Sequence, residues 1–218
     1  MQSLAKSGGP LMVAIWALLL AAALAAVAAT RWDIAFVSLA TLGLSLLPPL
    51  VAARWSLSLP LPFLLATTIF IFASVFMGEA LDFYERVWWW ELVLHGTAAI
   101  GLGLTGFLFV FMLFEGARFA APPSALAFIT FCVAMMAGAK WEVFEYAMDQ
   151  LFGLNMQKSG LDDTMGDLII NAVGAVISAI TGYIYVKHSY AGILGRSLTQ
   201  FIQHNRRLYS KYKDRLRK

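Results

Sequence analysis

Trp141-Glu-Val-Phe-Glu-Tyr146 lies near the end of one long apolar run, and Asp162-Asp-Thr-Met-Gly-Asp167-Leu-Ile-Ile-Asn171 lies at the start of the next. Both segments are rich in acidic residues within an otherwise hydrophobic sequence. Ionisable side chains at membrane depth are costly, so they usually mark function. The two segments therefore predict a pair of membrane helices joined by a polar loop, with an acidic site at that end.

The composition is typical of an integral membrane protein. Of the 218 residues, 60% are hydrophobic and 13% are charged, whereas a soluble domain carries about 25% charged residues. Several apolar runs reach the ~18 residues of a transmembrane helix, and their lack of alternation favours helices over a barrel. The fold class is therefore predicted to be an all-α, polytopic membrane bundle. The single cysteine, Cys132, excludes an internal disulfide. The net charge of +3 is too small to favour a nucleic-acid partner.

Six transmembrane helices are expected, forming a single domain over residues 1–194. Pro48-Pro49 should kink or end the second helix, whereas Pro122-Pro123 suits the start of the fifth. Residues 195–218 are expected to form a basic amphipathic tail, whose apolar face includes Leu198, Ile202 and Tyr209. The six helices are predicted at about 11–29, 34–53, 60–76, 88–114, 122–149 and 163–186.

The basic residues predict the orientation of the chain. An even number of helices puts both termini on one side, together with Arg54, Arg118 and Lys187. The opposite side holds Arg31 and Lys158, with Arg86. The positive-inside rule then places both termini in the cytoplasm. The tail would lie along the anionic inner leaflet, or would simply anchor the topology.

The acidic residues gather at the opposite side, away from the cytoplasm. Arg86, Lys140 and Lys158 are the basic residues expected there, so the local balance is −7 if all groups are ionised. At ~1.5 Å of rise per residue, polar side chains from three helices reach a similar depth of about 6–12 Å below the helix ends. Ten of the thirteen acidic residues share this side: Glu79, Asp82, Glu85, Glu91, Glu142, Glu145, Asp149, Asp162, Asp163 and Asp167.

The spacing of these polar residues predicts a divalent-metal site. Glu91 and His95 share one helix face, and Asp163, Asp167 and Asn171 form a ladder on another. Oxygen ligands suit Mg, and a histidine shifts the preference toward Mn, Fe or Zn. His95 and Asp167 are also the predicted catalytic residues. The predicted ligands are Glu91, His95, Glu142, Glu145, Asp163, Asp167 and Asn171.

Several of these residues have structural alternatives. Asp162 or Asp163 could be a helix N-cap, and Thr164 with Asp167 imitates a capping box. His95 could be a neutral core histidine. Lys140 could point outward, or it could pair with the buried acids in place of a metal.

The motifs also resemble a known family. Tyr84-Glu-Arg-Val-Trp-Trp-Trp-Glu-Leu-Val-Leu-His95, Trp141-Glu-Val-Phe-Glu-Tyr146 and Asp163-Thr-Met-Gly-Asp-Leu-Ile-Ile-Asn171 look like the bacterial inner-membrane family called YjdF-like, a domain of unknown function. The resemblance covers about residues 60–187 and implies a compact helical membrane domain whose polar motif comes from three helices. That family commonly carries aspartate at the position of Glu91. A looser similarity is to VanZ-like membrane proteins.

Three functions are compatible with these patterns. The first is a divalent-metal-binding protein open to the periplasm, acting on lipid headgroups or lipid-linked phosphates, with membrane lipids as partners. The second is an accessory or assembly subunit of a larger membrane complex, in which the acids form a structural polar network with a protein partner nearby. The third is a cation or proton transporter, because the acidic side would concentrate cations. The few charges in the cytoplasmic halves of the helices speak against the third.

Overall fold

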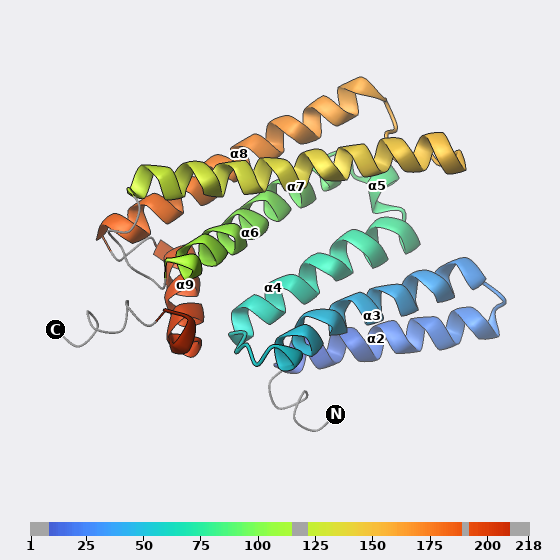
Figure 1. Ribbon diagram of the computed structural model, residues 1–218. Helices are drawn as coiled ribbons and strands as arrows, with labels where there is room; N and C mark the ends of the chain where they lie inside the picture. Colours follow the sequence, from blue (N-terminus) through green and yellow to red (C-terminus); the bar gives the residue numbers. More distant parts are fainter. Residues whose placement is uncertain (1–8, 115–121, 189–191, 210–218) are drawn as a thin grey trace. The chain divides into compact units, whose positions relative to one another are not determined.

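The computed structural model describes residues 9–114, 122–188 and 192–209, which are helical apart from short connections (Figure 1). Six spans of 19 to 30 residues are long and apolar enough to cross a membrane, since a bilayer needs about 20 residues of helix. The prediction of an all-α, polytopic bundle is confirmed. The spans are α2 (Pro10–Ala28), α3 (Trp32–Arg54), α4 (Leu61–Ile71) continued by η1 (Phe72–Ala80), α6 (Trp90–Leu113), α7 (Pro123–Phe152) and α8 (Leu161–His188).

Helix α3 runs through Pro48-Pro49 to Arg54, close to the predicted end at residue 53, which membrane helices tolerate when neighbouring groups satisfy the freed backbone. The third span runs beyond the predicted residue 76 because α4 passes into a π-helix, η1, that ends at Ala80. Gly78 within η1 leaves room for the ring of Tyr84, which a Cβ at that position would strike.

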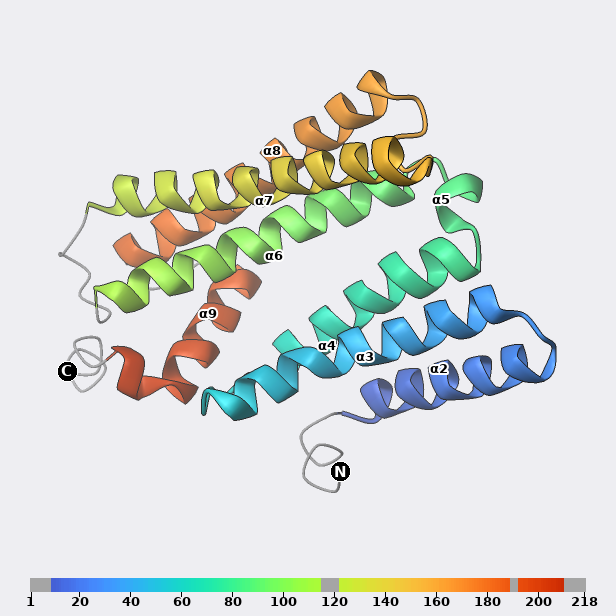
Figure 2. The ribbon, with the colours of Figure 1, turned by 45° about the vertical axis from the view of Figure 1, so that its right-hand side comes forward.

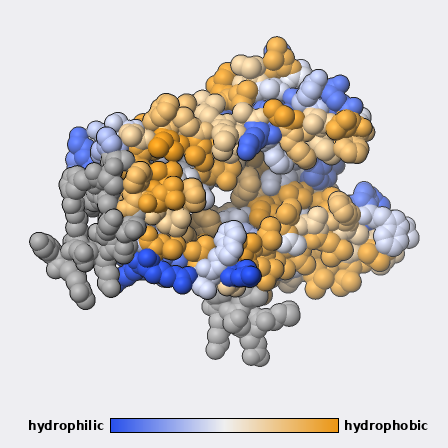
Figure 3. Space-filling view, in the orientation of Figure 1, coloured by the Kyte–Doolittle hydropathy of each residue, from blue (hydrophilic) through white to orange (hydrophobic). Residues whose placement is uncertain are grey.

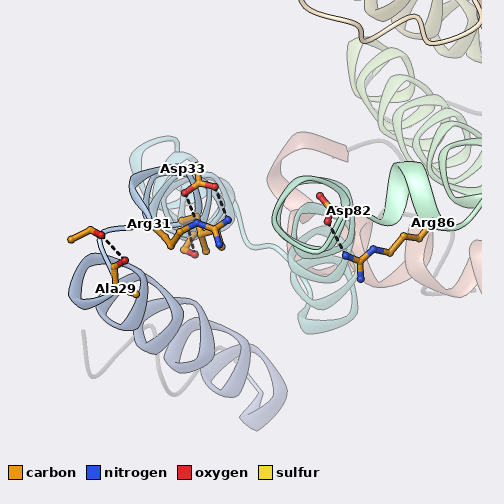
Figure 4. Close-up of polar contacts among 8 residues, drawn as sticks. Ala29, Arg31, Asp33, Asp82 and Arg86 are labelled. Carbon is orange, nitrogen blue, oxygen red and sulfur yellow. Dashed lines mark hydrogen bonds and ion pairs between the residues drawn. The ribbon is translucent and has the colours of Figure 1, made fainter.

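The chain divides into two compact units, residues 1–90 and 91–218, and each is described by itself. In the first unit α2 and α3 pack as a hairpin, and the Trp16 indole donates a 3.0 Å hydrogen bond to Ser45 Oγ. An ion pair of 3.0 Å joins Arg31 to Asp33 beside the hairpin turn (Figure 4). It is exposed and therefore contributes little stability. The single-domain organisation stays a prediction.

Three long helices, α6, α7 and α8, lie side by side in the second unit (Figures 1 and 2). Glycines allow α6 and α8 to approach closely, as small residues do where membrane helices pack against each other. A Cβ at Gly174 would meet the Gly96 carbonyl oxygen, and one at Gly182 would meet the Phe107 ring. Hydrophobic residues cover most of the visible face of the long helices (Figure 3), which is the surface that lipid would contact.

The C-terminal segment packs against these helices. Leu198 and Ile202 of α9 (Gly192–His204) and Tyr209 of the 3-10 helix η2 (Arg206–Tyr209) join a buried cluster with Phe107 and Tyr185. The amphipathic pattern predicted for the tail is therefore present, and its apolar face is buried against α6 and α8. The rest of the predicted tail, residues 210–218, lies outside the described residues.

Candidate metal centre

One end of the second unit gathers the polar residues from three helices. Helices α6 and α8 begin there and α7 ends there, with residues 153–160 joining α7 to α8. At ~1.5 Å per residue, His95 lies about 8 Å from the start of α6 and Asp167 about 9 Å from the start of α8. Glu142 lies about 15 Å from the end of α7 by the same rise of ~1.5 Å per residue. The three side chains converge because each helix turns its polar face inward.

Glu91, His95 and Asp167 form the group best placed to hold an ion. Each offers one ligand atom, and these atoms all lie within 4.8 Å of one another. His95 Nε2 is 3.8 Å from Asp167 Oδ2. The Asp167 side chain is only 2% exposed, and that of His95 10%. One imidazole and two carboxylates are a ligand set that suits Mn, Fe or Zn.

The other imidazole nitrogen of His95 faces two more of the predicted site residues. His95 Nδ1 is 3.6 Å from Glu142 Oε1 and 3.4 Å from Asn171 Nδ2. If Nε2 binds an ion, Nδ1 carries the proton and can point it toward Glu142 Oε1. The Asn171 amide must then turn its oxygen, and not its Nδ2 donor, toward Nδ1, because two donors do not bond to each other. A carboxylate behind a metal-binding histidine fixes the tautomer and the orientation of the ring. The geometry therefore places Glu142 and Asn171 beside Nδ1 of His95, whereas Asp167 lies beside Nε2.

Asn171 has its position because α7 carries a glycine opposite it. A Cβ at Gly138 would collide with the Asn171 amide. The amide group can therefore lie against α7 and reach the imidazole of His95. Nothing in the sequence pairs Gly138 with Asn171, since they come from different helices.

Glu145 completes the buried acids on α7. Its Oε1 accepts a 2.7 Å hydrogen bond from the Trp141 indole, which explains why the tryptophan precedes it by one helical turn. Several buried carboxylate oxygens have no hydrogen-bond partner among the described residues. They are Glu142 Oε1 and Oε2, Glu145 Oε2, Asp163 Oδ2 and Asp167 Oδ2. Buried polar groups are normally satisfied, and an unpaired buried charge is costly.

The start of α8 does not have Thr164 and Asp167 arranged as a capping box. Thr164 lies inside the helix, and its Oγ1 accepts a 2.7 Å hydrogen bond from Gln157 Nε2. The capping-box interpretation of Thr164 with Asp167 is therefore wrong, because Asp167 is buried in the second turn. Asp162 and Asp163 lie in the first turn of α8. Asp162 is exposed and Asp163 is half-buried, so these neighbours have different surroundings.

Of the two lysines on this side, Lys158 contacts the site and Lys140 does not. Lys140 is exposed, so the alternative in which it pairs with the buried acids is not what the structure shows. Lys158 instead lies 2.8 Å from Glu91 Oε2 through its Nζ. The position of Lys158 in the loop between the two acidic segments is the sequence signal that could have indicated this pairing.

The loop that carries Lys158 is held by another acidic residue. The Asp149 carboxylate accepts hydrogen bonds of 2.7 Å from the Met156 N–H and 2.9 Å from the Gln157 N–H. Asp149 was expected only as one of many acids on this side. It stabilises the loop and does not contribute to the ligand group.

Comparison with known proteins places the chain in a family. Residues 10–188 match the family described as "Predicted membrane protein (DUF2238)". The chain belongs to this family. The DUF2238 match spans every residue of the candidate metal centre and confirms the expected multi-pass membrane protein, while the YjdF-like resemblance stays a prediction.

The chain is also similar to an uncharacterized protein. An uncharacterized protein from Thermotoga maritima is 30% identical over 117 residues, which are 52% of this chain and 59% of that protein. The chain therefore spans well under two thirds of the relative it matches. No solved structure matches the chain.

Proposed function

We propose that this DUF2238 protein binds a divalent metal ion through Glu91, His95 and Asp167. The observation that supports this most directly is the close approach of these three buried ligands, within 4.8 Å of one another. Glu145 and Asp163, which the sequence predicts as ligands, are proposed here to supply further negative charge around the ion. His95 and Asp167 remain the residues proposed for any chemistry at the ion.

The balance of charge supports a bound cation. The site holds the carboxylates of Glu91, Asp167 and Asp163 and of two α7 glutamates, against the single ammonium of Lys158. Four negative charges remain uncompensated if every group is ionised. Isolated buried carboxylates cost several kcal/mol each, at an order-of-magnitude level. A divalent ion would offset half of this charge and give the unpartnered oxygens a ligand.

The donor atoms indicate which divalent ions the site would prefer. A set of two carboxylates and one imidazole favours Mn, Fe or Zn, and Mg is the hard-ion alternative. We propose that Glu142 orients His95 from behind and is not a direct ligand, because it faces Nδ1 while Asp167 faces Nε2.

The depth of the site suggests the substrate class. His95 and Asp167 lie roughly 8–9 Å from the helix ends, near the headgroup region of a bilayer. We propose that the site opens to the periplasm of a bacterial inner membrane, as the distribution of basic loop residues predicts. A metal at this depth would meet a lipid headgroup or a lipid-linked phosphate, so membrane lipids are the proposed partners.

The proposal is tested by metal content. Detergent-purified protein would be analysed by inductively coupled plasma mass spectrometry beside Asp167→Asn and the Glu142→Gln, Glu145→Gln double variant. Asp162→Asn is the matched control, because Asp162 is an exposed carboxylate on the same helix. We expect about one equivalent of metal in the wild type and the control. Asp167→Asn should lose this metal, whereas the double variant should retain part of it, because its two glutamates support the site without binding the ion. The folded peak should remain in both variants.

The opposite result would favour a different function. Wild-type protein that stays metal-free after incubation with Mn, Zn or Fe would overturn the metal proposal. The acids would then form a structural polar network, as expected for a subunit of a larger complex. Transport is less favoured, because the cytoplasmic halves of the helices carry few charges that could continue a path.

A further inference from the structure

We propose that Lys158 competes with the metal ion for Glu91 and, once the ion is bound, contacts a phosphate oxyanion beside it. This inference rests on the proposed metal site and names the residue that would select its anionic ligand. It assigns to one side chain both a cation-competing and an anion-recognising role.

The first support is the ion pair itself. Lys158 Nζ is 2.8 Å from Glu91 Oε2, and Glu91 belongs to the ligand group. The Lys158 side chain is 26% exposed and that of Glu91 14%, whereas that of Asp167 is 2% exposed. Glu91 is therefore more accessible than Asp167, and the Lys158 ammonium already contacts its carboxylate. An ion that binds Glu91 has to displace or share this contact.

The second support is that the backbone beneath Lys158 is held in place. Asp149 fixes the N–H groups of Met156 and Gln157, and Gln157 Nε2 bonds to Thr164 Oγ1 on α8. The loop can thus stay where it is while the lysine side chain moves. Lysine has a flexible four-carbon stem and a compact charge, so its ammonium can turn away from Glu91 at little cost.

The third support is electrostatic. A divalent ion and an ammonium on the same carboxylate repel each other, so binding of the ion favours release of the ammonium. Both positive charges would then face the same opening. A phosphate group, with several oxygen acceptors, can bind a metal and a lysine together. Free phosphate and a lipid phosphate headgroup share this chemistry.

The competition is tested by Mn²⁺ binding. Free Mn²⁺ would be followed by electron paramagnetic resonance with full-length protein in phosphatidylcholine nanodiscs. We expect Lys158→Met to bind Mn²⁺ at least about ten-fold more tightly than the wild type, because a charge a few ångströms from the ion is removed. Lys158→Arg should stay near the wild type, and so should Lys140→Met, which removes an exposed lysine from α7.

The possible outcomes separate the two proposals. Mn²⁺ binding by the wild type with unchanged or weaker binding by Lys158→Met overturns the role of Lys158 and leaves the metal site intact. A wild type that binds no Mn²⁺, Zn²⁺ or Fe²⁺ overturns the metal site, and the Lys158 proposal falls with it.

The anion role is tested with phosphate itself. Line broadening of the phosphorus-31 signal by bound Mn²⁺ would be measured for inorganic phosphate and, separately, for phosphatidic acid in phosphatidylcholine nanodiscs. Broadening in the wild type that falls at least about ten-fold in apparent affinity in Lys158→Met supports the proposal. Broadening of inorganic phosphate identifies a free anion as ligand, and broadening of phosphatidic acid alone identifies the headgroup. Equal broadening in both proteins, or none in either, overturns the role.

Discussion

His95 is the residue around which the other side chains of the site are arranged. Its Nε2 faces Asp167, at 3.8 Å from the carboxylate Oδ2. Its Nδ1 faces Glu142 Oε1 at 3.6 Å and Asn171 Nδ2 at 3.4 Å. The imidazole thus separates a ligand side from a supporting side. This separation makes different predictions for acids that look alike in the sequence.

Glu142→Gln should weaken metal binding without abolishing it. An amide cannot hold the Nδ1 proton of His95 as a carboxylate does, and loss of such a supporting group costs about 10–100-fold in metal affinity. Asp167→Asn removes a direct ligand and should cost more. Competition with a fluorescent chelator would measure both, with Asp162→Asn as the unaffected control. Equal losses for Glu142→Gln and Asp167→Asn would show that Glu142 is itself a ligand.

The sequence indicates which residues share a helix face, but it does not indicate which atoms meet across helices. The i,i+4 spacing of Glu91 and His95 follows from helical geometry alone. The arrangement of Glu142 behind His95 depends on how α7 is rotated and how closely it approaches. Gly138 sets that approach by leaving room for Asn171. The pairing of Lys158 with Glu91 depends on the path of a loop, which hydrophobic periodicity does not describe.

At the scale of the elements, the packing of α6 against α8 depends on a few small residues. A Cβ at Gly174 would meet the backbone carbonyl of Gly96, which cannot rotate away as a side chain can. Gly101, on the same helix as Gly96, has nothing within 4 Å of such a Cβ. Gly174 is therefore needed for the close packing of α6 and α8, whereas Gly101 is not, although the sequence places both glycines in apolar helices.

Gly174→Ala should destabilise the protein, whereas Gly101→Ala should not. Overpacking costs about 1–3 kcal/mol, and it should exceed the gain of about 1 kcal/mol from replacing glycine in a helix. Gly101→Ala retains that gain without a clash. Thermal unfolding in detergent, followed by intrinsic fluorescence, would compare the midpoints. A Gly174→Ala midpoint equal to or above that of Gly101→Ala would contradict the close packing.

The attachment of the C-terminal segment depends on Tyr209. Its hydroxyl donates a 3.0 Å hydrogen bond to the Leu108 carbonyl of α6, and its ring is buried beside Phe111. Tyr209→Phe keeps the ring and removes the bond, so it should cost about 0.5–1.5 kcal/mol. Thermal unfolding at neutral pH would measure this loss. An unchanged midpoint would mean that the hydroxyl adds nothing to the attachment.

The same residue makes a prediction about pH. Burial raises the pKa of the Tyr209 phenol above its ordinary value of 10.0. The stability that it contributes is present in full below the unfolded pKa and is lost as the pH rises above about 10. The difference in the thermal unfolding midpoint between the wild type and Tyr209→Phe should therefore become smaller above about pH 10. A difference that widens with rising pH would contradict a buried, neutral phenol.

Helix positions are the part of the fold that the sequence predicts best. Continuous apolar runs give six spans because length and hydrophobicity decide membrane insertion. The ends differ where local geometry decides, as in η1, where a π-helix around Gly78 extends the third span to Ala80. The burial of Leu198 and Ile202 against α6 and α8 also exceeds what the amphipathic pattern indicates, since the pattern fits lipid as well as protein.

At the scale of the whole molecule, the topology decides what the site can meet. If each of the six spans crosses the membrane, the loop between α7 and α8 faces the compartment opposite to that of the α3–α4 connection. Lys158 lies in the α7–α8 loop, and the candidate metal centre lies at the same end of these helices. The proposed lipid or phosphate ligand is available to the site only from the compartment that this loop faces.

Single-cysteine labelling would establish that compartment. In a Cys132→Ser background, Ser159→Cys marks the α7–α8 loop and Ser58→Cys marks the α3–α4 connection, and both serines are exposed. The positive-inside rule predicts that a membrane-impermeant maleimide labels Ser159→Cys in intact spheroplasts, and labels Ser58→Cys only after permeabilisation. The reverse labelling pattern would place the acidic residues and His95 at the cytoplasmic side of the membrane. The metal would then come from the cytoplasmic pool, and the lipid ligand would have to come from the inner leaflet.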